Sequence, residues 1–462
     1  MIALPFMHGY VVAVLGLGRS GLATAKALVA NGAEVWAWDD SEDVRARAAA
    51  ADIPLVNLYE ANWLEPVSLV ISPGIPHRHP EPHPVAKLAR DAGVEIICDV
   101  ELLGRAQADA TYVGITGTNG KSTTTAAIAH VLNLARRRIE MGGNIGRPVM
   151  ELEPMQPDGF YVLELSSYQL ELTLSITFDV GVLLNITPDH LERHGGLEGY
   201  VAVKRNIFHR QTKPRTAIIG IDDDICRGIW QELLKQDDQV IWPVSGRRRA
   251  PGGVYAEDGM LWDETSGQKT PVLPLGELPR LPGEHNWQNA AATYAACKAA
   301  GVEPAVIAAS LRSFPGLAHR QEKVAEIAGV TFVNDSKATN ADAAGKALAC
   351  YDRIYWIAGG QPKEGGLAGL DDLYGRVKQA FLIGNAAQEF AASLEGKVKT
   401  EISGDLETAV RAAFAAARAE GREGSVVLLS PACASFDQFK DFEARGDAFK
   451  EIVTALRKEE AG

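Results

Sequence analysis

The feature that most constrains this chain is a short apolar run that leads directly into a glycine-rich loop and then into a helix-forming segment. We predict a strand at Tyr112 to Ile115, a loop at Gly117-Thr-Asn-Gly-Lys-Ser-Thr123, and a helix in the Ala- and Thr-rich residues that follow. Such a loop presents backbone N–H groups to phosphate, and Lys121 adds mobile positive charge. The first glycine of the standard Walker pattern would fall at Ile115, so a glycine-rich turn with an exposed lysine stays the alternative to a nucleotide-triphosphate site.

A second glycine-rich loop, Gly16-Leu-Gly-Arg-Ser-Gly21, also lies between a predicted strand and a predicted helix. Asp39 and Asp40 close the next strand about twenty residues later, which is the spacing of a dinucleotide-binding fingerprint. The same helix terminus suits any nucleotide diphosphate, so an NAD-dependent oxidoreductase, another nucleotide ligand and a purely structural turn all remain open.

Short apolar runs alternate with helical patterns along the whole chain, which predicts an α/β protein with mainly parallel sheets. At 462 residues the chain is long enough for roughly two to four domains. We predict three, at residues 1–105, 106–313 and 314–462. Strands are expected at Val11 to Leu15, Glu34 to Trp38, Leu69 to Ile71, Tyr161 to Leu165, Val180 to Leu184, Thr216 to Ile219, Thr331 to Val333, Ile354 to Ala358, Gln379 to Ile383 and Ser425 to Leu429. Residues 244–281 are expected to form irregular strands and turns, followed by a helix from Asn286 to Ala300.

Composition narrows the class of partner. A formal net charge of -13 disfavours nucleic acid and anionic membrane surfaces, because both would be repelled at long range. The five cysteines are scattered and odd in number, which favours a reducing compartment over a disulfide framework or a zinc knuckle. With neither a signal sequence nor a membrane span expected, we predict a cytoplasmic protein, and we take a monomer as the working expectation.

Four separated motifs stand in order along the chain: Gly117-Thr-Asn-Gly-Lys-Ser122, Glu164-Leu-Ser-Ser-Tyr-Gln-Leu-Glu171, Asn185-Ile-Thr-Pro-Asp-His190 and Asn334-Asp-Ser-Lys-Ala-Thr-Asn340. In these motifs the sequence resembles the Mur ligases, and the resemblance runs essentially end to end. It implies an N-terminal Rossmann-like domain for a UDP moiety, a central P-loop-type ATPase domain, and a C-terminal Rossmann-like domain that contacts an amino acid. Binding of the UDP moiety would then explain why the loop from Gly16 to Gly21 has a dinucleotide-type pattern in a protein that binds no dinucleotide.

Two further segments narrow the resemblance. Ser430-Pro-Ala-Cys-Ala-Ser-Phe-Asp-Gln-Phe439 and Gly142-Gly-Asn-Ile-Gly146 are most similar to the Mur ligases that add D-glutamate to UDP-N-acetylmuramoyl-L-alanine in peptidoglycan precursor synthesis. The implied reaction consumes ATP, passes through an acyl phosphate, and releases ADP and phosphate. Four alternatives remain. Two are related enzymes, namely a ligase for another Mur step and a folylpolyglutamate synthase. The other two are the NAD-dependent oxidoreductase and a nucleotide-switched binding protein that catalyses no reaction.

The resemblance also implies site residues. The ATP-binding set is Gly117, Thr118, Asn119, Gly120, Lys121, Ser122, Thr123, Asn286, Asn289, Arg320 and Asp335. The UDP-substrate set is Arg19, Ser20, Gly21, Ser41, Ser72, Gly74 and Asn144. Asn286 and Asn289 lie three residues apart and would bind adenine from one helix face, with helix capping as the alternative. Arg320 would reach the γ-phosphate on domain closure, since guanidinium is an always-charged donor fork.

The expected catalytic residues are Lys121, Glu164, His190 and Lys204, and the expected metal ligands are Ser122, Glu164, His190 and Lys204. Two Mg²⁺ ions are implied, with Lys204 carbamylated by CO₂ because an unmodified lysine would oppose a cation. The alternatives without a catalytic role are that Glu164 is a surface carboxylate at the end of a strand, that His190 is a surface histidine in a turn, and that Lys204 is a solvated lysine on a helix.

The D-glutamate set implied by the resemblance is Lys337, Thr339, Lys363, Ser435, Phe436 and Phe442. A lysine with hydroxyl and backbone donors suits a dicarboxylic amino acid. The sequence departs from the family pattern at two points. Gln-Pro precedes Lys363 where a smaller pair is expected, and Phe436 stands where leucine is common, so the geometry around Lys363 is in question.

Overall fold

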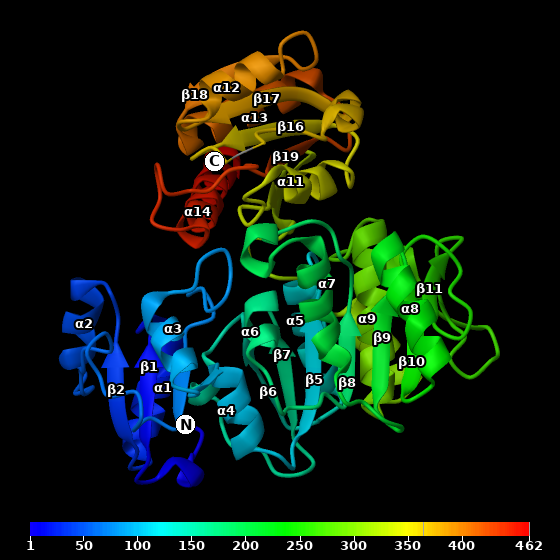
Figure 1. Ribbon diagram of the computed structural model, residues 1–462. Coiled ribbons are helices and arrows are strands. Elements are labelled where there is room, and N and C mark those ends of the chain that lie inside the picture. The colour runs from blue at the N-terminus through cyan, green and yellow to red at the C-terminus, as the bar shows by residue number, and fades with distance from the viewer. Residues whose placement is uncertain (364, 462) are drawn as a thin grey trace. The chain divides into compact units, whose positions relative to one another are not determined.

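The computed structural model describes residues 1–363 and 365–461, and its N-terminal region alternates strands with helices (Figure 1). The strands are β1 Val11–Leu15, β2 Glu34–Trp38, β3 Ser68–Ile71 and β4 Glu95–Ile97, and the helices are α1 Arg19–Ala30, α2 Glu42–Ala49, α3 Pro84–Asp91 and α4 Asp99–Ala106. The strands are parallel in the order β2-β1-β3-β4. Chain order reverses between β1 and β3, where open α/β sheets form a ligand crevice at the carboxyl ends of the strands.

The central region forms a nine-stranded sheet in the order β13-β12-β11-β10-β9-β8-β5-β7-β6. Its strands are β5 Thr111–Thr116, β6 Ile139–Gly143, β7 Phe160–Glu164, β8 Val180–Leu183, β9 Thr216–Gly220, β10 Val240–Ser245, β11 Val254–Glu257, β12 Met260–Asp263 and β13 Thr270–Pro274. Its helices are α5 Lys121–Leu134, α6 Ser167–Glu171, α7 Leu197–Arg205, α8 Asp224–Gln236, α9 Glu284–Ala299 and α10 Pro304–Arg312. Every residue of β7 and β8 is buried, as expected for parallel strands covered on both faces.

Strand β5 lies between β8 and β7, and this position determines what can surround the glycine-rich loop. All three strands are parallel, so their carboxyl ends meet at one edge of the sheet. The residues that follow β7 and β8 therefore flank the loop that follows β5. The far end of the sheet differs, since β12 pairs antiparallel with both β11 and β13.

The C-terminal sheet has six strands in the order β14-β15-β19-β16-β17-β18. Its strands are β14 Glu322–Ile327, β15 Val330–Asn334, β16 Ile354–Gly359, β17 Val377–Ile383, β18 Thr400–Gly404 and β19 Val426–Leu429, and its helices are α11 Ala341–Leu348, α12 Ala387–Ser393, α13 Leu406–Glu420 and α14 Phe442–Ala461. Strands β14 and β15 form an antiparallel hairpin, and the others are parallel. Two clusters of buried apolar side chains pack on this sheet, one around Trp356 and one around Phe332.

The predicted α/β class with mainly parallel sheets is confirmed in all three regions. Residues Met1–Leu278 with Asn286–Phe314 form one compact unit, and Pro279–His285 with Pro315–Gly462 form another. The exact domain limits at 105 and 313 stay predictions. Within the described residues, no helix combines the length and the apolar character that crossing a membrane requires.

Candidate active site

The glycine-rich loop connects β5 to α5 through two residues in backbone conformations that favour glycine. Gly117 has a φ of 154° and Gly120 a φ of 84°. A Cβ built on Gly120 would lie 2.3 Å from Asn289 Oδ1, so the close approach of helix α9 also demands glycine here. Helix α5 starts at Lys121, and its first N–H groups therefore face the loop, as a phosphate-binding terminus requires.

Residues after β8 hold this loop in place. The Asn119 N–H donates to Asn185 Oδ1 at 2.9 Å, and Asn185 Nδ2 donates back to the Asn119 carbonyl at 3.1 Å. Thr118 is held in the same way, because its N–H donates to the Asn185 carbonyl at 2.9 Å and its hydroxyl to the Thr187 carbonyl at 3.0 Å. Asn185 and Thr187 were not among the predicted site residues, although both stand in the motif Asn185-Ile-Thr-Pro-Asp-His190.

Two lysine amines converge on one carbonyl oxygen of the loop. Lys121 Nζ donates to the Gly117 carbonyl at 3.0 Å and to the Thr118 carbonyl at 2.9 Å. Lys204 Nζ, from helix α7, donates to the same Gly117 carbonyl at 2.9 Å and lies 3.4 Å from Thr116 Oγ1. Both predicted catalytic lysines therefore lie at the glycine-rich loop, although 83 residues separate them in the sequence.

Lys204 is the unusual one of the pair because it is only 2% exposed. Burial, reinforced by the nearby charge of Lys121, lowers the pKa of Lys204 to about 7. Its amine also lies 4.8 Å from the centre of the Tyr200 ring, which is itself buried. A substantial fraction of Lys204 is therefore an uncharged, nucleophilic amine near neutral pH.

Glu164 ends strand β7 beside the loop and is 2% exposed. Its Oε1 accepts a hydrogen bond of 2.9 Å from Asn144 Nδ2, while its Oε2 is buried and has no hydrogen-bond partner among the described residues. Leaving a carboxylate oxygen buried and unpaired is costly, so this oxygen fits a bound cation. Asn144, a predicted UDP-substrate residue, thus directly contacts a predicted metal ligand.

His190 follows β8 at the tip of an exposed turn. Its side chain is 52% exposed, its φ is 50°, and its Nε2 lies 3.4 Å from Asp189 Oδ2. The ring centres of His190 and Tyr168 are 5.3 Å apart. Among residues 1–363 and 365–461, no three His, Cys, Asp or Glu side chains form a ready-made metal-ligand group, and the roles of Ser122, Glu164, His190 and Lys204 as metal ligands stay predictions.

The two asparagines of α9 are buried, and Asn289 lies against the glycine-rich loop. Asn289 Nδ2 donates to Asn286 Oδ1 at 3.1 Å. Helix α9 begins at Glu284, two residues earlier than predicted, so Asn286 and Asn289 lie within the first two turns of the helix. Their predicted role at adenine stays a prediction.

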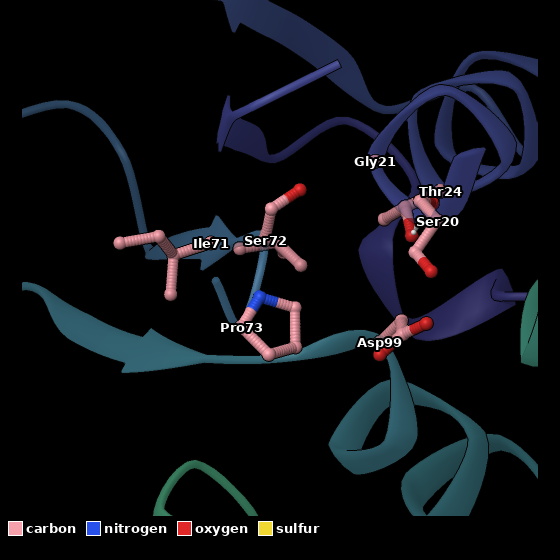
Figure 2. Close-up of a pocket in the computed structure, with 8 residues that line it drawn as sticks. Ser20, Gly21, Thr24, Ile71, Ser72, Pro73 and Asp99 are labelled. Atoms are coloured by element: carbon pink, nitrogen blue, oxygen red, sulfur yellow. Dashed lines mark hydrogen bonds between the residues drawn. The ribbon is translucent and has the colours of Figure 1, made fainter. Parts of the chain in front are cut away.

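A small pocket lies at the carboxyl ends of β1 and β3, where the reversal of chain order predicts a crevice (Figure 2). Its lining is Ser20, Gly21, Thr24, Val70, Ile71, Ser72, Pro73 and Asp99. Three of these, Ser20, Gly21 and Ser72, belong to the predicted UDP-substrate set. A Cβ at Gly21 would lie 1.8 Å from the Gly16 carbonyl oxygen, which explains the glycine. Asp99 was not predicted to be at this site, and burial raises its pKa to about 6.

The remaining predicted UDP-substrate residues lie around the pocket or next to it. Arg19 Nη2 donates to the Gly146 carbonyl at 2.9 Å, which joins α1 to the glycine-rich segment after β6. Gly74 is exposed in the turn after β3. Ser41 precedes α2, and its hydroxyl accepts the Val44 N–H at 3.4 Å as a helix cap.

The acidic residue of the dinucleotide-type fingerprint is used internally. Asp39 Oδ2 accepts the Leu17 N–H at 2.7 Å, and Asp39 Oδ1 accepts the Ser41 N–H at 2.9 Å. One carboxylate oxygen therefore braces the loop between β1 and α1, and the other braces the turn that leads into α2. This arrangement gives no particular support to a ribose contact of the NAD type.

The C-terminal unit gathers its predicted residues at the carboxyl ends of the neighbouring strands β15, β19 and β16. Asp335 Oδ2 accepts the Ser430 hydroxyl at 2.8 Å, and burial raises the pKa of Asp335 to about 7. Lys337 Nζ lies 3.9 Å from the centre of the Phe442 ring, and Ser435 is 2% exposed. Thr339 is half-buried in the same loop as Asp335 and Lys337.

Two predicted D-glutamate residues are instead exposed within this unit. Phe436 is 70% exposed, and Lys363 is exposed after the loop at Gly359 and Gly360. Arg320 is half-buried between His319 and Gln321, both of which have positive φ. The roles of Phe436 and Lys363 in binding D-glutamate, and of Arg320 in binding the γ-phosphate, stay predictions.

Arg445 on α14 is a residue that the sequence reasoning missed. Its guanidinium is 1% exposed and joins two of the predicted loops. It donates to the Ser336 carbonyl at 2.8 Å, the Cys433 carbonyl at 3.1 Å and the Ala434 carbonyl at 3.2 Å. A helical arginine is ordinarily assigned to the surface, so only the burial reveals it as the brace of this site.

Three family models match successive parts of the chain. They are described as "Mur ligase MurD-like, N-terminal domain" at residues 10–98, "Mur ligase middle domain" at residues 115–297, and "Mur ligase, glutamate ligase domain" at residues 319–433. The second match contains the glycine-rich loop and Lys204, and the first contains most of the pocket in Figure 2.

Curated relatives match over nearly the full length. A protein of Rhodospirillum rubrum is 52% identical and covers 97% of this chain and 95% of its own length. Proteins of Caulobacter sp. strain K31 and Paramagnetospirillum magneticum are each 51% identical and cover 99% of both chains. All three are named UDP-N-acetylmuramoylalanine--D-glutamate ligase.

Solved structures share the fold at lower identity. A UDP-N-acetylmuramate-alanine ligase from Thermotoga maritima is 19% identical, with a TM-score of 0.58 and coverage of 97% of this chain and 100% of that one. The UDP-N-acetylmuramoylalanyl-D-glutamyl-2,6-diaminopimelate--D-alanyl-D-alanyl ligase from Acinetobacter baumannii is also 19% identical, with a TM-score of 0.57 and coverage of 98% and 92%. From the three family models and the half-identical relatives, this chain belongs to the Mur ligase family.

Proposed function

We propose that this chain is an ATP-dependent ligase that joins D-glutamate to the carboxyl group of UDP-N-acetylmuramoyl-L-alanine in peptidoglycan precursor synthesis. The observation that carries the phosphoryl-transfer part is the convergence of Lys121 and Lys204 on the Gly117 carbonyl, at the start of helix α5. The substrate is inferred from the relatives of that name, which are about half identical to this chain over at least 97% of its length.

Amide formation from a free carboxylate is unfavourable in water, so the carboxylate must first be activated. Its oxygen attacks the ATP γ-phosphorus, which forms an acyl phosphate and releases ADP. The uncharged amine of D-glutamate then attacks the acyl carbon, forms the amide bond and expels inorganic phosphate, while the amine loses its proton. The protein contributes alignment and charge neutralisation to both steps.

The chain's own residues have distinct tasks in this scheme. The N–H groups at the start of α5 and the Lys121 amine would hold the β- and γ-phosphates. The bonds from Asn185 to the Asn119 peptide keep the loop in one conformation, so the donors need not reorganise during the reaction. His190, exposed beside Tyr168, would orient the substrate carboxyl group.

The residues beside the loop fit Mg²⁺, because Glu164 presents a buried carboxylate oxygen with no hydrogen-bond partner among the described residues. Glu164 and the Ser122 hydroxyl would hold one ion, and His190 and a modified Lys204 a second. Bound Mg²⁺ supplies neutralisation of the phosphate charge.

Carbamylation of Lys204 is part of the proposal. The uncharged amine attacks CO₂, forms a C–N bond and releases one proton, which replaces a cation by an anion. A pKa of about 7 leaves much of the amine uncharged at neutral pH, whereas an ordinary lysine would be almost fully protonated. Carbamylation would also replace the repulsion between the two lysine cations with an attraction between the carbamate anion and the Lys121 cation.

D-Glutamate would bind at the loops of the C-terminal unit. Lys337, Lys363 and Thr339 would bind its two carboxylates, with Ser435, Phe436 and Phe442 around them. Arg445 fixes two of these loops through their carbonyl groups. We further propose that Asp335 and Arg320 contact ATP and that the enzyme acts in the cytoplasm as a monomer.

The test is phosphate release by the purified protein with ATP, Mg²⁺ and UDP-N-acetylmuramoyl-L-alanine. D-Glutamate, L-glutamate, L-alanine and a diamino acid are added in separate reactions, and the ligated product is identified by mass. We expect release with D-glutamate alone and none in the Lys121→Ala variant. Release that is independent of the amino acid, or that requires a different one, would contradict the proposed substrate.

A further inference from the structure

Arg193 is a buried arginine to which neither the motifs nor the reaction scheme assigns a role. It lies in the short 3₁₀ helix η3 Leu191–His194, directly after the exposed turn that carries His190. It is 8% exposed, and burial lowers the pKa of its guanidinium. Burying a guanidinium is costly unless it is paired, so its contacts should account for its position.

One side of the Arg193 guanidinium contacts the segment that continues from the wall of the N-terminal pocket. Arg193 Nη2 donates to the Ile75 carbonyl at 2.7 Å and lies 3.4 Å from the Pro73 carbonyl, while Nη1 lies 3.4 Å from the His79 carbonyl. Pro73 lines the pocket together with Ser72 (Figure 2). The three carbonyls therefore belong to the segment from Pro73 to His79 that continues from this wall.

The other side of Arg193 leads to the predicted catalytic histidine. The Arg193 backbone N–H donates to the His190 carbonyl at 3.0 Å. Its guanidinium lies 5.1 Å from the centre of the Tyr168 ring, and that ring is 5.3 Å from the His190 ring. The Arg193 side chain thus anchors the turn that presents His190, in which its own backbone lies, to the N-terminal pocket wall, and both lie in the same compact unit.

A buried carboxylate compensates the charge of this arginine. Glu171 at the end of α6 places Oε2 3.9 Å from Arg193 Nη1, and burial raises the Glu171 pKa. The imidazoles of His77 and His194 add no charge at neutral pH, because burial lowers the pKa of His77 to about 3 and that of His194 to about 4. Arg193 is therefore the arginine that forms the ion pair with Glu171, and the charges of Arg78 and Arg90 also favour the ionised carboxylate.

We propose that Arg193 is a positioning residue that sets the distance between the UDP-substrate pocket and His190. This inference rests on the proposed function, because it assumes that the UDP precursor occupies the pocket wall and that its carboxyl end reaches His190. Losing Arg193 would release the Pro73–His79 segment and weaken binding of the UDP precursor, while the ATP loop, held by Asn185, would keep its conformation.

The experiment compares Arg193→Met and Arg193→Lys with a matched control, Arg215→Met. Arg215 forms a half-exposed ion pair with Asp179 at 3.3 Å, at the opposite end of the same sheet. Steady-state KM values are measured separately for UDP-N-acetylmuramoyl-L-alanine and for ATP. Binding of the UDP precursor is also measured by calorimetry without turnover, and the melting temperature of each variant is recorded.

For Arg193→Met we expect the KM and Kd of the UDP precursor to rise about 10- to 100-fold, the range for losing charge-assisted hydrogen bonds. The KM of ATP should stay within about 2-fold. Arg193→Lys should restore part of the affinity, because it keeps the cation but not the planar fork that reaches several carbonyls. Arg215→Met should change neither constant.

An unchanged Kd for the UDP precursor in a folded Arg193→Met variant would overturn the inference, as would equal increases in both KM values. If Arg193→Met does not fold, Glu171→Gln replaces it. That variant keeps the carbonyl contacts but removes the countercharge, and we expect a smaller rise for the UDP precursor alone. Wild-type protein that binds the UDP precursor but shows no D-glutamate-dependent turnover would contradict the proposed function and leave the binding test of Arg193 valid.

Discussion

Replacing Lys204 with methionine should stabilise the protein at low pH and progressively less as the pH rises. The lysine is 2% exposed and has a pKa of about 7 in the folded protein, against an ordinary value of 10.5. Below pH 7 the amine is charged in both the folded and the unfolded states, so folding bears the full cost of burying the charge. Methionine has a similar shape and bears no such cost.

The pH dependence of this difference follows from proton linkage. Between pH 7 and 10.5 the unfolded chain binds more protons at this residue than the folded protein does, so the stability of the wild type rises with pH. The slope is about 1.4 kcal/mol per pH unit. From pH 6 to pH 9, the advantage of Lys204→Met over the wild type should therefore shrink by about 3 kcal/mol. The hydrogen bond from Lys204 to the Gly117 carbonyl changes the stability difference between the two proteins by a nearly constant amount. It has little effect on how that difference varies with pH.

The measurement is urea unfolding at pH 6, 7.5 and 9 in buffer freed of CO₂, since a carbamate would remove the cation. The midpoint of the transition that contains Lys204 should shift by up to about 1 M relative to the wild type across this range. The C-terminal unit, which lacks Lys204, supplies an internal reference, and Lys235→Met at an exposed helix position is the matched control.

A difference between Lys204→Met and the wild type that stays constant from pH 6 to pH 9 would refute this reasoning. It would mean that the buried amine keeps an ordinary pKa, and the physical argument for an uncharged nucleophile that captures CO₂ would fail with it.

Three further predictions concern the glycine-rich loop and the amino-acid site. Lys121→Ala should abolish phosphate release, and normal release would remove the loop from the reaction. Gly120→Ala should raise the KM of ATP at least about 10-fold, because its Cβ would meet Asn289 at 2.3 Å, whereas Gly252→Ala, with a similar φ of 76° and nothing within 4 Å, should cost only about 1 kcal/mol of stability. Lys363→Ala should raise the KM of D-glutamate about 10-fold or more with little change for ATP, and an unchanged value would place the amino acid elsewhere.

The secondary structure was largely accessible from the sequence, because parallel strands covered by helices are nearly continuous apolar runs. The predicted strands Val11 to Leu15 and Glu34 to Trp38 coincide with β1 and β2. Short strands separated by glycine and proline carry a weaker signal. The antiparallel arrangement of β11, β12 and β13 within residues 244–281 therefore emerged only from the structure.

The position of the predicted active site followed from local chemistry as well. A glycine-rich loop between a strand and a helix, and a glutamate at the end of a strand, belong at the carboxyl edge of a parallel sheet. The structure places the loop after β5 and Glu164 at the end of the neighbouring β7. The sequence did not reveal the residues that hold the site loops in place, such as Asn185 and Arg445. Their role depends on hydrogen bonds to residues that are far away in the chain.

By itself, the sequence determined the α/β class, the two glycine-rich loops and the family resemblance, since these depend on residue type and short-range spacing. Only the tertiary structure decided that Lys204 is buried on the Gly117 carbonyl with a lowered pKa, and that Arg193 joins the pocket wall to the His190 turn. The physical reason is common to both. Burial, charge and the pairing of a polar group are set by atoms that approach from distant segments, and a linear spacing pattern does not contain those distances.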